Sequence, residues 1–325
     1  MRKVVIVTEG GQEFGFGHLT RCSAFYDFFY GKNFEVEFII QGDLKAKKYL
    51  KNKKVTLLDW HNNINKNLIP VLDTDILILD SYCISQEDAK LLSNLSVNLV
   101  VIEDFIRRDY TNAIIIDWSL NADKLDYYKI KNPTNTYLLG IDYLVIRKAF
   151  IDLYNTPKKS NSIEVLISLG GSDIRNLTGS IVNKISNKFP NINFHAVIGS
   201  DNDKTIIKNK FNNIYKYNNL NEKEMASLMQ KCHVAVSGGG QTLYELAVLN
   251  VDIMAIELIE NQKEELKVWE DNKLLLFNLK WNDDNLIEHI FNTIKRFDLN
   301  KKNKLFLFNS NGLNKIYQNI ITKQA

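Results

Sequence analysis

The stretch from Glu9 to Cys22 carries the residue types best suited to chemistry in this sequence. It reads Glu-Gly-Gly-Gln-Glu-Phe-Gly-Phe-Gly-His-Leu-Thr-Arg-Cys, follows an apolar run at residues 3–8 and precedes a helical pattern at residues 19–30. A glycine-rich turn between a strand and a helix brings backbone amides close to an anionic ligand. His18 stands where the helix begins, and its imidazole can exchange a proton near neutral pH. A tight strand–helix turn with a capping or solvated histidine is the alternative interpretation.

The first half of the chain alternates strand-like and helical runs. Short apolar runs rich in β-branched residues lie at 34–41, 55–59, 76–80, 97–102 and 114–117. Several are apolar throughout, as strands buried on both faces of a parallel sheet are. A helix is predicted at residues 85–95, where Ser85 followed by Glu87 and Asp88 is typical of a helix N-terminus. This alternation predicts an open α/β sheet.

Polar residues close three of these predicted strands. They are Asp80-Ser81-Tyr82, Glu103-Asp104 and Asp117-Trp118. The carboxyl ends of the strands line the binding crevice in open α/β sheets, so these side chains are candidates for a site. An ordinary helix cap or turn is the alternative for each of them.

A second strand–helix series follows a polar stretch at residues 154–162, which is predicted to be an interdomain linker. The expected domains are therefore residues 1–155 and 162–325. Strands are predicted at 164–169, 193–198, 214–217, 234–237, 252–257 and 274–278, and helices from 176 and at 222–231, 265–271, 284–297 and 313–323. The last helix is one that could cross back onto the first domain.

Two more glycine turns lie in this second series. In Ser237-Gly-Gly-Gly-Gln-Thr-Leu-Tyr-Glu the glycines expose amides at a helix N-terminus, where the helix dipole favours phosphate. Thr242 can donate a hydrogen bond to a phosphate oxygen, and the Glu245 carboxylate can accept two ribose hydroxyls. Glu245 could equally be a favourable dipole contact in the first turn. Gly170-Gly171-Ser172-Asp173 is a similar turn, with simple tight packing as its alternative.

Bulk composition sets further expectations. The 325 residues are 45% hydrophobic, enough for two cores, and 41 basic residues nearly balance 38 acidic ones. No attraction to nucleic acid or to a membrane surface follows from that charge. Three widely spaced cysteines without a CxxC pair predict neither disulfides nor a structural zinc site. With neither a signal peptide nor a membrane-length apolar run, a cytoplasmic location is predicted; the oligomeric state is not fixed by the sequence, and a monomer is expected.

Several motifs together resemble one known family. The motif segments are Gly-Phe-Gly-His-Leu-Thr-Arg-Cys at 15–22, Asp-Ser-Tyr at 80–82, and the segments 139–150, 167–173, 237–245 and 260–262. They are similar, in order, to the UDP-2,4-diacetamido-2,4,6-trideoxy-β-L-altropyranose hydrolases of pseudaminic acid biosynthesis. The likeness covers most of the chain up to about residue 275. Where that family has an Arg-Ala-Asp-like segment after the first strand, this chain has Thr8-Glu9-Gly10-Gly11.

The resemblance implies a glycosyltransferase-B-like fold, with two Rossmann-like domains facing a central cleft and UDP held mainly by the second. It implies that His18 activates the attacking water, without a metal or another cofactor. The substrate-binding residues predicted on this basis are Gly15, Gly17, Arg21, Tyr82, Asp104, Tyr143, Gly171, Ser172, Gly239, Gly240, Thr242, Glu245, Asn261 and Gln262.

One histidine could suffice for such a reaction. Ordinary inverting glycosidases use two carboxylates, but a nucleoside diphosphate already leaves as a stable anion and needs no general acid. A base for water is then enough, and histidine has a suitable pKa. The other histidines lie outside glycine turns and are predicted to be ordinary surface or core residues. A glycosyltransferase of the same fold that uses a UDP-sugar donor, or a non-catalytic nucleotide-sugar-binding protein, are the alternative functions.

Overall fold

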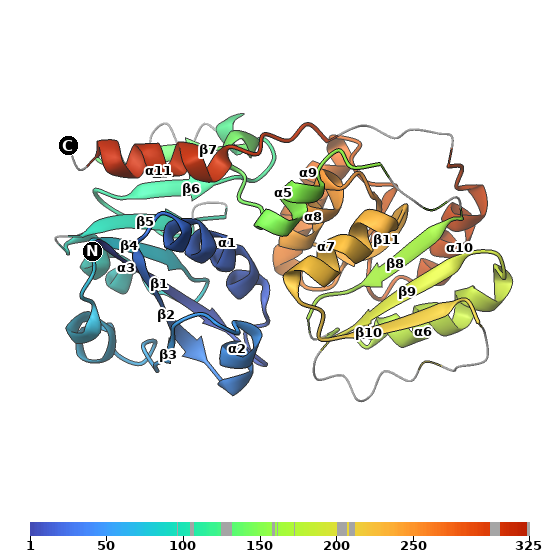
Figure 1. Cartoon of the computed structure of the whole chain (residues 1–325), viewed down its shortest axis with the longest axis horizontal. Coiled ribbons are helices and arrows are strands. Elements are labelled where there is room, and N and C mark those ends of the chain that lie inside the picture. Colours follow the sequence, from blue (N-terminus) through green and yellow to red (C-terminus); the bar gives the residue numbers. More distant parts are fainter. Residues whose placement is uncertain are drawn as a thin grey trace. The chain divides into compact units, whose positions relative to one another are not determined.

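The computed structural model describes residues 1–95, 97–104, 107–124, 132–157, 160, 162–171, 173–199, 207, 212–299 and 306–323. The chain forms two compact units, Met1–Val145 with Phe308–Ala325 and Ile146–Leu307 (Figure 1). The division falls before the polar stretch 154–162, because helix α5 (Lys148–Leu153) contacts helix α7 (Glu222–Lys231) of the second unit. The backbone N–H of Ala149 donates to Glu222 Oε1 at 2.9 Å across this contact.

The first unit is built on a seven-stranded parallel sheet. Its order is β3-β2-β1-β4-β5-β6-β7, and every pairing in it is parallel. The strands are β1 Lys3–Gly10, β2 Glu35–Gly42, β3 Val55–Leu57, β4 Ile76–Asp80, β5 Asn98–Ile102, β6 Ile114–Asp117 and β7 Thr136–Leu139. The longer helices are α1 Gly17–Gly31, α2 Leu44–Tyr49, α3 Gln86–Ser93 and α11 Gly312–Thr322, with short turns η1 Ile64–Leu68, η2 Ile69–Val71, η3 Ala122–Lys124 and η4 Ile141–Tyr143.

Strand order places a topological switch point between β1 and β4. Chain connections leave β1 toward β2 on one side and reach β4 on the other, as in dinucleotide-binding sheets. Thr8 of β1 pairs with Asp80, the last residue of β4. All five residues of β4 are buried because helices and loops cover both faces of the sheet. The carboxyl ends of β1 and β4 are therefore where a ligand crevice is expected in this unit.

Helix α11 belongs to the first unit although residues 146–307 precede it (Figure 1, red helix beside β7). Gly312 lies so close to the carbonyl oxygen of Leu144 that a Cβ there would be 2.2 Å from that oxygen. The Tyr317 ring packs edge-on against three rings of α1 and the turn after it, which are Phe28, Phe29 and Phe34. An apolar face of the helix thus completes the cover of this sheet.

The second unit repeats the arrangement on a six-stranded parallel sheet. Its order is β10-β9-β8-β11-β12-β13, with the switch point between β8 and β11. The strands are β8 Glu164–Ser168, β9 Asn193–Ile198, β10 Ile214–Asn218, β11 Val234–Gly238, β12 Asp252–Glu257 and β13 Phe277–Lys280. Besides α5 and α7, its helices are α6 Leu177–Ile185, α8 Gln241–Val248, α9 Lys263–Asp271 and α10 Leu286–Arg296, with turns η5 Ser186–Lys188 and η6 Glu260–Gln262. Both glycine turns of this half follow the switch-point strands.

The parallel α/β architecture predicted from the sequence is confirmed, with two local differences. Strand β7 is an edge strand that the apolar pattern did not reveal. The strand expected at 274–278 begins only at Phe277. Lys273 adopts a left-handed φ of 58°, and the N–H of Leu274 donates to Trp269 O at 3.1 Å. These bonds close the end of α9. The N–H of Leu276 then donates to Ile253 O of β12 at 2.7 Å, just before β13 begins.

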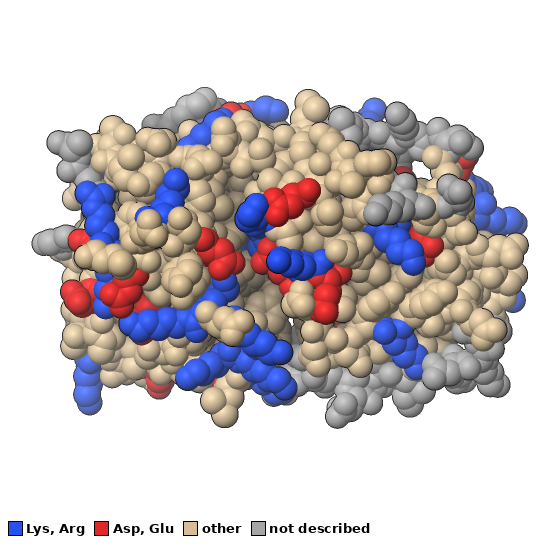
Figure 2. All heavy atoms as spheres, viewed as in Figure 1, with Lys and Arg blue, Asp and Glu red and all other residues tan. Residues whose placement is uncertain are grey.

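Charged side chains of both signs are interspersed on the face of the molecule shown in Figure 2. Among the residues that the structure describes, there is no helix with the length and apolar character to span a bilayer. The three cysteines are free thiols, with Cys22 and Cys232 buried and Cys83 exposed.

Candidate functional site

The glycine turn before α1 is held in a closed conformation that presents His18. Gly15 has a left-handed φ of 77°, and its carbonyl accepts the N–H of Gly11 at 2.9 Å. Gly17 is the first residue of α1, so His18 lies in the first turn of the helix. Its side chain is buried beside the carboxyl ends of β1 and β4, with 6% of the residue exposed. The turn thus places the His18 imidazole at the switch point between β1 and β4.

Asp80 fixes the orientation of His18. The His18 Nδ1 lies 2.8 Å from Asp80 Oδ1, and His18 Nε2 makes no hydrogen bond to any described residue. Burial acts to raise the pKa of Asp80, but the charges of Arg21 and His18 outweigh it and hold that pKa well below its usual range. An ionised Asp80 accepts Nδ1–H, which leaves the lone pair on Nε2. The imidazole is therefore arranged to accept a proton at Nε2.

Arg21 joins Asp80 to a second carboxylate. Its Nε donates to Asp80 Oδ2 at 2.6 Å, and its Nη1 donates to Asp104 Oδ2 at 3.0 Å. Burial would lower the pKa of Arg21, but Asp104 and Asp80 hold it well above its usual range. The Tyr82 hydroxyl donates to Asp104 Oδ2 at 2.7 Å, and the Tyr82 ring meets the His18 ring edge-on with centroids 4.5 Å apart. Four of the predicted site residues are thus in one hydrogen-bonded and ring-packed group.

Glu103 is a buried carboxyl beside this group. It follows β5, is 2% exposed, and accepts the backbone N–H of Arg107 at 2.9 Å. Burial raises the pKa of Glu103 to about 7, although the nearby Arg107 charge works in the opposite direction. The protonated form of Glu103 is therefore favoured by folding.

Glu103 should make stability fall with rising pH. A pKa raised from 4.5 to about 7 contributes about 3 kcal/mol that is fully present below pH 4.5 and is lost as the pH rises through about 7. We expect the unfolding free energy of the wild type, measured with urea, to fall relative to that of Glu103→Gln by about this amount between pH 4.5 and 8. The exposed Glu87→Gln variant is the control and should follow the wild type. Parallel curves for wild type and Glu103→Gln would contradict the assignment.

The second-unit glycine turn, Gly238 to Gly240, is locked by side chains from η6 and α9. The Gln262 amide donates to Gly239 O at 3.2 Å and accepts the N–H of Leu258 at 3.0 Å. A Cβ on Gly239 would lie 3.0 Å from the Gln262 side chain, which explains the need for glycine. Glu265 Oε2 accepts the N–H of Gly240 at 3.1 Å. The α8 N-terminus, with half-buried Thr242 in its first turn, is therefore held rigid.

Glu245 forms a buried ion pair with Arg147. Arg147 Nε donates to Glu245 Oε1 at 2.7 Å and Nη2 donates to Oε2 at 2.9 Å. Burial raises the pKa of Glu245 above its usual value, against the opposing charge of Arg147. Removing either partner would leave an uncompensated buried group. Glu245 thus has a structural role, and its contact with ribose stays a prediction.

The turn at Gly170 to Asp173 is capped from within. The Asp173 carboxylate accepts the N–H groups of Leu177 and Thr178, each at 3.0 Å, at the start of α6. Gly171 is exposed beside it, and the predicted site residue Ser172 lies outside the described residues. Asp173 therefore satisfies amides that the sequence pattern alone would offer to a ligand.

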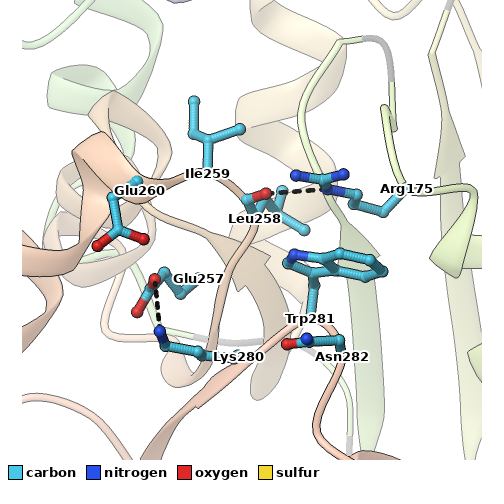
Figure 3. Close-up of a pocket in the computed structure, with 8 residues that line it drawn as sticks. All are labelled: Arg175, Glu257, Leu258, Ile259, Glu260, Lys280, Trp281 and Asn282. Atoms are coloured by element: carbon cyan, nitrogen blue, oxygen red, sulfur yellow. Dashed lines mark hydrogen bonds and ion pairs between the residues drawn. The ribbon is translucent and has the colours of Figure 1, made fainter.

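A pocket of about 280 Å³ opens at the carboxyl ends of β12 and β13 (Figure 3). It is lined by Arg175, Glu257, Leu258, Ile259, Glu260, Lys280, Trp281 and Asn282. The Arg175 guanidinium lies over the Trp281 ring at 4.2 Å, and its Nε donates to Leu258 O at 3.0 Å. Leu258 also lies against Gly238, so the pocket adjoins the glycine turn.

Sequence comparisons identify relatives of known name. No protein-family model matches the chain. The pseudaminic acid cytidylyltransferase and UDP-2,4-diacetamido-2,4,6-trideoxy-β-L-altropyranose hydrolase of Helicobacter pylori is 33% identical over 259 residues, which cover 79% of this chain and 44% of that protein. The UDP-2,4-diacetamido-2,4,6-trideoxy-β-L-altropyranose hydrolase of Campylobacter jejuni is 24% identical over 273 residues, covering 80% and 93%. Over most of its length the chain is similar to these UDP-2,4-diacetamido-2,4,6-trideoxy-β-L-altropyranose hydrolases. It spans less than half the length of the Helicobacter protein.

Solved structures show the type of fold that this chain adopts. UDP-GlcNAc 2-epimerase from Neisseria meningitidis, bound to UDP-GlcNAc, matches with a TM-score of 0.63 at 12% identity, covering 98% of this chain and 100% of that one. MurG of Acinetobacter baumannii matches with a TM-score of 0.61 at 13% identity, covering 99% and 100%. At these identities the likeness concerns the fold, which is of the glycosyltransferase-B type.

The predicted site residues of this chain fall into separate groups. In the first unit, Gly15, Gly17, His18, Arg21, Tyr82 and Asp104 lie at the switch point, whereas Tyr143 lies in η4 near Lys315 of α11. In the second unit, Gly239, Gly240, Thr242 and Gln262 surround the glycine turn, and Asn261 is exposed on η6. Sequence reasoning made Asp80 a candidate through its place at a strand end, without a specific role, and gave no role to Arg147. Both lie in motif segments of the resemblance, which was the available signal.

Proposed function

We propose that this chain hydrolyses a UDP-linked 2,4-diacetamido-2,4,6-trideoxy sugar at its anomeric carbon, releasing UDP and the free sugar. The observation that carries the proposal is the buried bond between His18 Nδ1 and Asp80, which directs the basic Nε2 outward from that pair. The names of the relatives supply the substrate class. The free sugar would then enter pseudaminic acid biosynthesis.

His18 is proposed as the general base. Water gives a proton to His18 Nε2 as its oxygen bonds to the anomeric carbon, and the electrons of the breaking C–O bond leave with UDP. Asp80 stabilises the imidazolium that forms, because its negative charge lies 2.8 Å from Nδ1. A single displacement of this kind inverts the configuration at the anomeric carbon. Neither a general acid nor a metal ion is needed for the leaving group, since UDP leaves as an anion.

The nucleotide is proposed to bind the second unit. The α8 N-terminus, with Gly239 and Thr242, would hold the diphosphate through backbone amides and the helix dipole. The Gly240 N–H donates to Glu265, so Gly240 would contribute through its close backbone approach. The pocket beside it, where Arg175 stacks on the Trp281 ring, would receive the base (Figure 3). Glu245 would bind ribose through lone pairs that Arg147 leaves available. This chain has Thr8-Glu9-Gly10-Gly11 where the hydrolases have an Arg-Ala-Asp-like segment. That difference would affect the part of the site that holds the sugar.

Turnover in ¹⁸O-labelled water tests which bond breaks. UDP-2,4-diacetamido-2,4,6-trideoxy-β-L-altropyranose is the substrate, UDP-GlcNAc is the comparison, and EDTA is present throughout. We expect the label on the sugar, unlabelled UDP, and the α-anomer as the first product seen by NMR. Proton transfer to a placed base supplies a factor of about 10²–10⁴ of this rate.

Three results would contradict the proposal. Label in UDP would show attack at phosphorus, and complete loss of turnover in EDTA, as opposed to a partial loss, would show that a metal ion takes part in bond cleavage. UDP release that requires an added acceptor sugar or lipid would instead indicate a glycosyltransferase.

A further inference from the structure

Glu9 has a buried carboxylate oxygen without a hydrogen-bond donor. Glu9 is 1% exposed and lies near the end of β1. Its Oε1 accepts the backbone N–H groups of Tyr82 and Cys83 at 2.5 and 3.2 Å. Its Oε2 has no hydrogen-bond partner in the part of the chain that the structure describes. A buried anionic oxygen in this state is costly unless a cation or donor meets it.

His61 presents a second unsatisfied atom to that oxygen. His61 Nε2 lies 3.5 Å from Glu9 Oε2 and is itself buried without a hydrogen-bond partner among the described residues. The Cys83 thiol completes the group, because one ligand atom from each of the three residues lies within 4.8 Å of the other two. The three residues come from β1, from the segment between β3 and η1, and from the segment between β4 and α3.

The spacing suits a tetrahedral metal ion. Bonds of about 2.0–2.3 Å at a tetrahedral angle place two ligand atoms about 3.3–3.8 Å apart, so the Glu9–His61 separation needs no change. Movement of the exposed Cys83 side chain would bring its sulfur to the same spacing. Imidazole, thiolate and carboxylate together favour zinc over magnesium or calcium, which prefer oxygen ligands.

Outer contacts hold the ligands in place. The His61 ring packs edge-on against Trp60 with centroids 4.2 Å apart and against Phe14 at 5.6 Å. The backbone N–H of His61 donates to Gln41 Oε1 at 3.3 Å. The two amides on Glu9 Oε1 orient its free oxygen, as outer-shell groups do in metal sites.

We propose that Glu9 Oε2, His61 Nε2 and Cys83 Sγ form a binding site for one Zn²⁺-like transition-metal ion, with a fourth position open to water. This site is separate from the base His18 and takes no part in bond cleavage. Because Cys83 directly follows Tyr82, a bound ion would tie the loop that carries Tyr82 to the end of β1. The metal would thus fix the position of a residue that packs against His18.

Cobalt titration of the full chain tests this site. Co²⁺ absorbs through thiolate charge transfer and d–d transitions that Zn²⁺ lacks, so the spectrum reports a cysteine ligand directly. We expect one Co²⁺ per chain with a charge-transfer band that Zn²⁺ displaces. Cys83→Ser should abolish the band, and His61→Gln should weaken Co²⁺ binding by 10-fold or more. His289→Gln alters an exposed histidine of the second unit and is the matched control.

Both test variants change exposed or partly exposed side chains, and circular dichroism checks that they fold. A charge-transfer band that survives in Cys83→Ser would overturn the site, since Cys22 and Cys232 are the other thiols. Absence of any band in the wild type, or equal affinity in His61→Gln and His289→Gln, would reduce the group to a Glu9–His61 ion pair. These spectra and affinities do not depend on turnover. The metal site can therefore be confirmed or rejected independently of the proposed hydrolase activity.

Discussion

Replacing His18 with alanine should lower turnover by about 10²–10⁴-fold, the usual contribution of a placed general base. UDP affinity should change little, because His18 belongs to the first unit and the proposed diphosphate and base contacts belong to the second. Steady-state release of UDP measures the first quantity, and calorimetry with UDP measures the second. The two together separate a chemical role from a binding role.

His289→Ala serves as the matched control for this variant, since it removes an exposed imidazole outside the site. It should retain wild-type turnover and UDP affinity. Wild-type turnover in His18→Ala would show that another group activates water. A loss of UDP affinity as large as the loss of turnover would instead place His18 in nucleotide binding.

Asp80→Asn should impair both turnover and folding. The amide keeps the shape of the side chain but removes the negative charge that holds His18 Nδ1–H and pairs with Arg21. We expect turnover to fall by about 10²-fold or more, because the wrong tautomer of His18 becomes accessible. Arg21 keeps its bond to Asp104, so the loss of stability should lie near the lower end of the roughly 3–5 kcal/mol seen when a buried ion pair is broken.

A pH–rate profile distinguishes positioning of His18 from general loss of structure. Turnover per folded molecule should be lower in Asp80→Asn than in the wild type at every pH, because the amide no longer fixes the His18 tautomer that carries its proton on Nδ1. Asp117→Asn is the control: Asp117 is buried at the end of β6 and accepts the N–H of Ser119, which an asparagine oxygen can also do. If turnover per folded molecule were the same in Asp80→Asn and the wild type across the profile, Asp80 would be structural.

The apolar pattern of the sequence predicted the strands whose residues are buried along their whole length. The continuous apolar residues of β4 and the polar residues that end it were enough to place Asp80 at a sheet edge. Strand β7 was not predicted, because three of its four residues are only partly buried at the sheet edge, which weakens the apolar signal. The start of β13 was predicted too early, because a left-handed lysine is an uncommon residue at the end of a helix and gives no signal that the strand begins later.

The site was predictable as a set of residue types but not as a set of bonds. Motif position indicated His18, Arg21, Tyr82 and Asp104, and these four do lie together. That Asp80 orients His18, or that Arg147 pairs with Glu245, depends on contacts between residues 62 and 98 positions apart. Asp173 similarly looked like part of a ligand loop, while its carboxylate caps α6. Such pairings are set by sheet topology and carry no periodic signal.

The docking of α11 on the first unit bears on how the chain folds during synthesis. Lys323, just after α11, donates to the carbonyl of Asn112, 211 positions earlier. Residues 146–307 form a complete unit of their own between these partners. As domains fold in order of emergence from the ribosome, we infer that the second unit closes while the first still lacks α11. Until α11 emerges, the aromatic face that receives Tyr317 is exposed. A chaperone would bind this face during that interval of synthesis.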